Sequence, residues 1–409
     1  MNHINGFDFF GELPLEITID ILSRLPIGTV IRSKLVSKAW RDAIKSHEFV
    51  EAHRLKGEHK HEHDTFFVGT SYGDSVETSC GDSEGYKLLE GYGSSIPTTT
   101  TIPCTGTLAE YKPLLPYSSS VMGLMLLFCP LSEVFSICNP VTREYVRVPL
   151  PPSPSGKILD RVGRVLHFPK FHVTCFSYGI GLSNKSKQYK LVYIRGCYGC
   201  HIYTLGTGQW RVGPSPPKIE GYSHFFGGGN WASLDGKLYW VKDKENICSF
   251  DLESEVFTTF SAPLCARQYL GVPVGKICYS RRVCFLEERL CVCDVARTYV
   301  DIVMLIWTMR GEGDWRLLCT IRKDVFKGDM YMSLPIKVLD KGNKILMASS
   351  EGCGERYCYD INNTSITQIG YVAGDSLDQQ YTYACPFNPT FVPLKTLFQH
   401  QDKDIIHSF

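Results

Sequence analysis

The chain has 409 residues and is nearly electroneutral, with 43 lysines and arginines against 42 aspartates and glutamates. Such a balance creates no overall field that would attract nucleic acid or an anionic membrane surface, so we expect neither partner. A hydrophobic content of 44%, with 36 glycines and 22 prolines, excludes a disordered chain and predicts a sizeable, turn-rich core.

From the pattern of apolar residues we expect neither a secretory leader nor a membrane span. The first residues lack a basic start followed by an apolar run, and no stretch approaches the roughly 20 apolar residues that cross a bilayer. The 17 cysteines are too sparse in a chain of this length for a disulfide scaffold. We therefore expect a protein of the cytoplasm or the nucleus, with reduced thiols packed as small apolar groups.

The first sixty residues predict short helices. Ile17, Ile21, Leu22 and Leu25 recur close to the spacing that places apolar side chains on one helix face. Pro14 suits the first turn of this helix, and Pro26 ends it. A bundle of this size is marginal alone and would gain stability from a partner. Three further helices are expected near residues 29–35, 37–46 and 46–55, with hydroxyl N-caps at Thr29, Ser37 and Ser46.

From about residue 65 the pattern changes to short apolar strands separated by turn residues. A unit of three strands recurs five times, and a fixed step of six residues joins the end of its second strand to a large residue in its third. The polar residue that usually opens this step suits a hairpin turn. The five steps are Asn139 to Tyr145, Thr204 to Trp210, Asp251 to Phe257, Met309 to Trp315 and Asp360 to Ile366.

Repeats of this size are typical of propeller blades. We expect six blades, of which the remaining one is built from residues before the first unit and closed by C-terminal strands near residues 381–392. A pair of β-sandwiches, which would also contain many short strands, is the alternative.

The N-terminal part resembles the F-box family, through Leu13-Pro14, Leu25-Pro26 and the string VSKAW at residues 36–40. Gly28 and Leu35 depart from the plant pattern, where a basic residue and a cysteine are common. The remainder is similar to the F-box-associated domain of plants, through the strings CNPVTREYVRVP, GKLYWV and SFDLESEVF. We expect a helical F-box bundle at residues 9–56, a linker at 57–64, a six-bladed β-propeller-like domain at 65–394 and a tail at 395–409.

This resemblance implies a non-catalytic, substrate-recognition subunit of an SKP–cullin–F-box ubiquitin ligase, without cofactor or metal. An F-box scaffold that delivers no substrate and a propeller enzyme remain as alternatives. Apolar side chains of the bundle in excess of its core would form the interface, although some of them could serve only that core. The implied adaptor-binding residues are Leu13, Pro14, Ile17, Ile21, Leu25, Pro26, Val36 and Trp40.

The target should bind where propeller loops converge. Candidate loops are residues 149–164, 214–230, 309–314 and 370–380. Aromatic and arginine side chains dominate binding hot spots, which selects four residues within these loops. These residues are Tyr222, Phe225, Phe226 and Arg310.

Three cysteine or histidine motifs could carry chemistry. Residues 197–201 spell C-x-x-C-H, the haem-attachment motif, but they lie in a predicted hairpin. The histidines at 59, 61 and 63 lie in the predicted linker, without the further ligands of a structural zinc site. Cys291 and Cys293 would share one face of a strand and pack there. We expect no metal or cofactor at these motifs.

Overall fold

The fold is taken from a computed structural model of the chain. The described residues are 13–59, 66–72, 85–90, 98–103, 120–121, 123–129, 134–151, 176–195, 199–217, 231–265, 269–271, 278–297, 301–326, 333–349, 355–371, 380–397 and 406–408. Within these ranges, no helix combines the length and the apolar character needed to cross a membrane.

The described N-terminal residues form four α-helices: α1 (Leu15–Leu22), α2 (Ile27–Ser33), α3 (Lys38–Lys45) and α4 (His47–His59). Ser37 caps α3 by accepting a hydrogen bond from the Trp40 N–H (3.1 Å), and Ser46 accepts one from the Phe49 N–H (3.2 Å), so both predicted caps are confirmed. The predicted cap at Thr29 is wrong, because Pro26 opens α2 directly and Thr29 lies inside it. The last helix also runs into the predicted linker.

The described strands form six antiparallel sheets, which we number in chain order. The first two sheets are β24-β1-β2-β3 and β25-β7-β6-β5-β4. Their strands are β1 (Phe66–Tyr72), β2 (Gly85–Glu90), β3 (Thr98–Pro103), β4 (Ser120–Val121), β5 (Leu124–Cys129), β6 (Val134–Asn139), β7 (Glu144–Pro149), β24 (Gln380–Pro386) and β25 (Ile406–Ser408).

The other four sheets each contain four consecutive strands. The third is β8 (Phe176–Leu182), β9 (Tyr189–Arg195), β10 (Cys200–Thr204) and β11 (Trp210–Val212); the fourth is β12 (Trp231–Leu234), β13 (Lys237–Val241), β14 (Asn246–Asp251) and β15 (Phe257–Ser261). The fifth is β16 (Cys278–Leu286), β17 (Arg289–Arg297), β18 (Ile302–Gly311) and β19 (Asp314–Arg322); the sixth is β20 (Ser333–Leu339), β21 (Lys344–Ser349), β22 (Glu355–Asp360) and β23 (Ser365–Tyr371). Two short 3₁₀ helices are η1 (Asp340–Gly342) and η2 (Leu394–Leu397).

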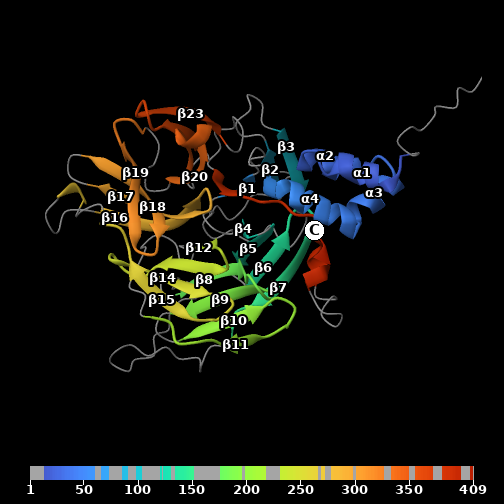
Figure 1. The fold of residues 1–409 in the computed structure, drawn as a ribbon, viewed down its shortest axis with the longest axis horizontal. Coiled ribbons are helices and arrows are strands. Elements are labelled where there is room, and N and C mark those ends of the chain that lie inside the picture. The colour runs from blue at the N-terminus through green and yellow to red at the C-terminus, as the bar shows by residue number, and fades with distance from the viewer. Residues whose placement is uncertain are drawn as a thin grey trace, which may run out of the picture.

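The sheets follow one another as in a propeller (Figure 1). Strand β4 contacts β8, and the contacts continue from β8 to β12, β16, β20 and β24, each of which is an edge strand of its own sheet. Strand β24 pairs with β1 from Tyr72 opposite Gln380 to Phe66 opposite Pro386, as the expected C-terminal closure requires. The propeller-like class is therefore confirmed over the pair of sandwiches, whereas the number of blades stays a prediction.

The fixed step of six residues has a local cause. Asn139, Asp251 and Asp360 each accept two backbone N–H bonds on the side-chain Oδ1, which closes a tight turn after the second strand. Four residues after each step begins, the backbone takes a positive φ in the connection between the second and third strands. This holds in all five units, at Arg143 (60°), Gly208 (70°), Glu255 (58°), Gly313 (80°) and Thr364 (51°).

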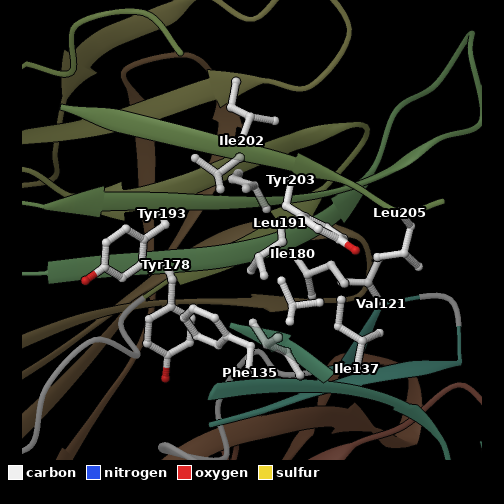
Figure 2. Packing of buried hydrophobic residues seen from close by; sticks show 14 of the residues in the cluster. Val121, Phe135, Ile137, Tyr178, Ile180, Leu191, Tyr193, Ile202, Tyr203 and Leu205 are labelled. Atoms are coloured by element: carbon white, nitrogen blue, oxygen red, sulfur yellow. The ribbon is translucent and has the colours of Figure 1, made fainter. Parts of the chain in front are cut away.

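The largest described apolar cluster lies between the second, third and fourth sheets (Figure 2). Phe135 of β6 packs against Tyr178 of β8, with ring centroids 5.1 Å apart. Alternating buried residues of neighbouring strands supply both sides of the cluster, as expected for sheets packed face to face. Two further clusters fill the spaces from the fourth to the fifth sheet and from the fifth to the sixth.

The end of the chain, predicted as a tail, is partly built into the propeller. Ile406 of β25 lies opposite Val146 of β7 and is buried in the same cluster as Phe135. The second sheet thereby gains a fifth strand from residues more than 250 positions further along the chain.

Candidate functional site

Helix α1 divides its apolar residues between two surfaces. Ile19 and Leu22 are buried in the bundle core, whereas Ile17 and Ile21 point to solvent. The expectation of a single face with Ile17, Ile21 and Leu22 together is therefore wrong. Leu22 has no exposed surface and Ile21 keeps 39%, although the two are neighbours in sequence. Ile17 and Ile21 lie one turn apart, so they form an apolar stripe that the bundle does not use.

A set of five large apolar side chains on α1 and on the α2–α3 connection is exposed to solvent. We call it the exposed apolar set: Leu15 (53%), Ile17 (49%), Ile21 (39%), Leu35 (81%) and Val36 (65%). Helices α1 and α3 pack together on the outer side of the bundle (Figure 1). Single exposed apolar residues are common, but several on two neighbouring elements mark an interaction surface.

The predicted adaptor-binding residues separate into two groups. Pro14, Ile17, Ile21, Pro26 and Val36 are exposed. Leu13, Leu25 and Trp40 are half-buried, and Leu25 and Trp40 pack against the cluster that joins the bundle to the propeller.

Sequence reasoning missed Leu15 and Leu35, two of the most exposed members of the set. The sequence marked Leu35 only as a departure from the plant F-box pattern and did not predict that it is exposed. Its place in the short connection before the Ser37 cap was the available signal, because a residue outside both helices has little core to enter.

The opposite side of the bundle is closed by the propeller. Ile19, Leu22 and Phe49 of the helices belong to one buried cluster with Met125 and Leu127 of β5. The cluster also contains Phe387 and Phe391 from the segment after β24. The bundle is therefore seated on the second sheet through this cluster and on β2 and β3 of the first sheet through α2, and its exposed apolar set faces away from both.

Of the predicted target-binding residues, the structure describes Arg310. It lies at the exposed tip of the β18–β19 hairpin, and its Nη2 contacts Asp314 Oδ1 at 3.2 Å. Both side chains remain more than half exposed, so the pair leaves the guanidinium accessible to a partner. Tyr222, Phe225 and Phe226 lie outside the described residues.

The cysteine motifs are packed in the core. Burial raises the pKa of the Cys200 thiol to about 12, which keeps it protonated and poorly reactive at neutral pH. Cys291 and Cys293 are buried on the same face of β17, as expected, and burial raises their pKa values to about 11 and about 12. Cys197 lies outside the described residues.

Histidine and acidic side chains are the other groups that could ligate a metal ion. Within the part of the chain that the structure describes, no group of three or more histidine, cysteine or acidic side chains could hold a metal ion. His59 ends α4, while His61 and His63 lie outside the described residues.

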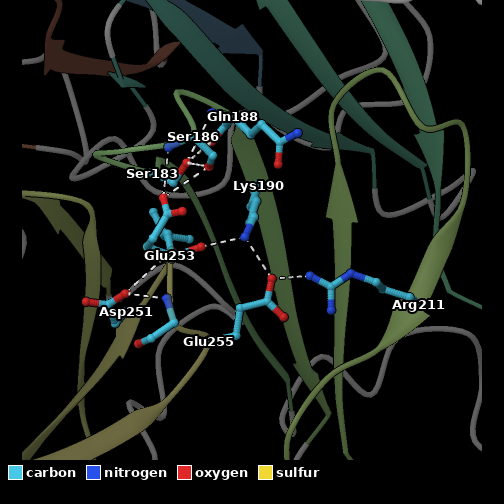
Figure 3. Close-up of polar contacts among 10 residues, drawn as sticks. Ser183, Ser186, Gln188, Lys190, Arg211, Asp251, Glu253 and Glu255 are labelled. Atoms are coloured by element: carbon cyan, nitrogen blue, oxygen red, sulfur yellow. Dashed lines mark hydrogen bonds and ion pairs between the residues drawn. The ribbon is translucent and has the colours of Figure 1, made fainter.

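A polar network joins the third and fourth sheets (Figure 3). Lys190 of β9 donates to the Leu252 carbonyl (2.5 Å) and to Glu255 Oε1 (2.7 Å), and Arg211 of β11 also binds Glu255. Burial opposes ionisation of the Glu255 carboxyl, but the hydrogen bonds from Arg211 and Lys190 outweigh it and lower the pKa. Each charge faces an opposite charge within the network, so its evident role is to fasten the two sheets.

Comparisons with known proteins agree with both parts of this architecture. The F-box domain model matches residues 10–51, and the model of the F-box associated beta propeller domain matches residues 102–394. An F-box protein of Arabidopsis thaliana is 26% identical over 320 residues, which cover 74% of this chain and 88% of that protein.

Two further Arabidopsis thaliana proteins align over a comparable length. An F-box/LRR-repeat/kelch-repeat protein is 26% identical over 77% of this chain and 78% of its own length. Another F-box protein is 25% identical over 83% of this chain and 89% of its own. With the helical bundle matched at one end and most of the sheets at the other, the chain belongs to the family of F-box proteins that carry an F-box associated beta propeller domain.

Proposed function

We propose that this protein is the substrate-recognition subunit of an SKP–cullin–F-box ubiquitin ligase, with the bundle bound to the SKP-type adaptor and a target protein held by the propeller. The exposed apolar set, on a bundle whose other side is already closed, is the observation that carries the proposal. Proteins of this family are typically non-catalytic adaptors, and we propose the same for this chain, in the cytoplasm or the nucleus.

The energetics favour a protein partner for this set. Fully burying an exposed large aliphatic side chain contributes about 1.5–3 kcal/mol, and each of the five side chains, which the bundle already covers in part, would contribute a share of this on binding. Association loses translational and rotational freedom, which costs several kcal/mol, so a set of this size is in the range that a stable interface needs. Pro14 precedes the first residue of α1 and Pro26 precedes the first residue of α2, so each fixes the backbone where a helix begins and limits the conformational freedom that binding would remove.

The adaptor interface is tested by charging its most exposed residues. A Leu35→Asp, Val36→Asp double variant of the full chain should retain the adaptor at least about 30-fold less well, because it places two carboxylates in an apolar interface. Both side chains are exposed, so the fold should survive. The measurement is adaptor retained on the purified protein against adaptor concentration.

The matched control is Val212→Asp in β11, which removes an apolar side chain of comparable exposure (78%) from the propeller. It should retain the adaptor as the wild type does. A Leu13→Ala, Pro14→Ala double variant should give a smaller loss than the charged variant. Equal retention by the wild type and both bundle variants would rule out docking through these residues.

For the target, we propose the face on which the propeller loops converge, with Arg310 as its described candidate. The exposed guanidinium at a hairpin tip supports this role, since arginine is enriched in binding hot spots. Tyr222, Phe225 and Phe226 complete the proposed set.

A further inference from the structure

The segment that follows β24 connects three parts of the molecule. We call residues 387–397 the strap. It leaves the first sheet, where β24 pairs with β1, and ends in η2 beside β7 of the second sheet (Figure 1). Phe387, Phe391 and Leu394 of the strap are all buried. Such burial is unusual for a segment without strand pairing, and it indicates that the strap fills a space between larger elements.

The strap contacts the F-box through Phe391. The Phe391 ring meets the rings of Phe49 and His53 on α4 edge to face, with centroids 5.3 Å and 5.0 Å apart. Lys34, at the end of α2, places its Nζ 5.2 Å from the centre of the same ring. Burial lowers the pKa of Lys34, so its ammonium lies partly out of water, where a cation–π contact is stronger. One strap residue thus touches two helices.

The strap contacts the second sheet through Asn139. The Asn139 Nδ2 at the end of β6 donates to the carbonyls of Thr390 (3.1 Å) and Val392 (2.8 Å). Glu144 of β7 accepts a hydrogen bond from the Leu394 N–H (2.5 Å). Gly123 lies directly below the strap with φ +83°, and a Cβ there would overlap the Thr390 side chain.

The identity of residue 139 distinguishes the strap contact from the turn contact. Asp251 and Asp360 close the corresponding turns of the fourth and sixth sheets with a carboxylate oxygen, so this turn does not require asparagine. Asn139 makes the same turn with its Oδ1 and uses its Nδ2, which aspartate lacks, for the strap. Asparagine is therefore needed at residue 139 for the contact with the strap and not for the turn.

We propose that the strap locks the F-box onto the second sheet, so that bundle and propeller are held in one fixed orientation. The strap supplies the wall that α4 packs against, and Asn139 holds that wall in place. The proposal concerns contacts within the chain and does not depend on whether an adaptor binds.

The test replaces the donor and leaves the turn intact. In full-length Asn139→Asp, a carboxylate faces two carbonyl oxygens, so the strap should detach while the turn persists. Amide hydrogen exchange should accelerate at least about tenfold in residues 387–397 and in α4, and stay unchanged in the fourth to sixth sheets. The control is Asp360→Asn, which changes the same atoms in a turn that binds no strap and should leave strap and α4 exchange at wild-type rates.

A second variant covers the case in which Asn139→Asp unfolds the whole chain. Phe391→Leu keeps the Asn139 bonds and removes only the ring contacts, and it should accelerate exchange in α4 alone. The proposal is overturned if α4 keeps its wild-type protection in every folded variant of residues 139 and 391. It is equally overturned if Asp360→Asn loosens α4 as much as Asn139→Asp. Adaptor retention by these variants should equal that of the wild type, which separates this outcome from failure of the proposed function.

Discussion

At the scale of single residues, Arg281 and Asp294 form a buried ion pair in the described part of the propeller. The guanidinium binds both carboxylate oxygens (2.8 and 2.7 Å), and the two side chains are 2% and 0% exposed. Arg281 also donates to the carbonyls of Lys244, in the β13–β14 connection of the fourth sheet, and of Pro263, just after β15. A single side chain in β16 therefore ties the fourth sheet to the fifth.

Removing one member of this pair should be far more damaging than removing both. Asp294→Ala leaves a buried guanidinium without its counter-ion, and we expect a loss of about 3–5 kcal/mol in the free energy of unfolding. An Arg281→Met, Asp294→Leu double variant should lose less, because no buried charge remains. Urea unfolding measures both variants. The control is Arg310→Ala, whose exposed pair with Asp314 should leave the unfolding midpoint unchanged, and equal losses at all three sites would contradict this account.

At the scale of elements, the turn after β14 does two tasks. Its last residue, Glu255, has the positive φ that ends the turn, and its carboxylate binds Lys190 and Arg211 of the third sheet. Asp251 begins the same turn and caps it with two backbone hydrogen bonds (Figure 3). The hydrogen bonds of Asp251 thus shape the turn, and the shape of the turn places the Glu255 carboxylate beside the third sheet.

This link should respond to acid. The pKa of Glu255 is lowered in the folded protein, so its contribution to stability is complete above the unfolded-state value of about 4.3 and is lost as pH falls through the folded value. Glu255→Gln should therefore be less stable than the wild type at pH 7, and the difference should shrink below about pH 4. Urea midpoints at several pH values measure it. A difference that is the same at every pH would show that packing, not charge, is lost.

At the scale of the whole molecule, the architecture makes a prediction about the fate of a bound target. In cells, proximity labelling from the propeller should identify the same neighbours for the wild type and for the Leu35→Asp, Val36→Asp variant. At least one neighbour should accumulate with the variant, because the target stays bound while the adaptor is lost. Val212→Asp serves as the control and should leave neighbour levels unchanged. Accumulation of no neighbour would favour a scaffold that delivers no substrate.

Much of the fold follows from neighbouring residues. Hydroxyl caps at Ser37 and Ser46 start two helices, and the turn chemistry of Asn139, Asp251 and Asp360 produces hairpins wherever it occurs. Each of these caps and turns depends on residues within about four positions of one another in the sequence, so a sequence pattern is enough to predict it. The order of the repeats was sufficient to predict the propeller-like class.

The candidate site depended on the tertiary structure. The sequence by itself identified the bundle and most of its apolar surface, yet it did not separate exposed Ile21 from buried Leu22, since that choice is made by the elements packed against α1. It placed Asn139 in a turn, but the second bond of that amide goes to carbonyls some 250 residues away. Local chemistry determined the helices and hairpins, whereas only long-range packing decided which apolar side chains stay free for a partner and how the F-box is seated.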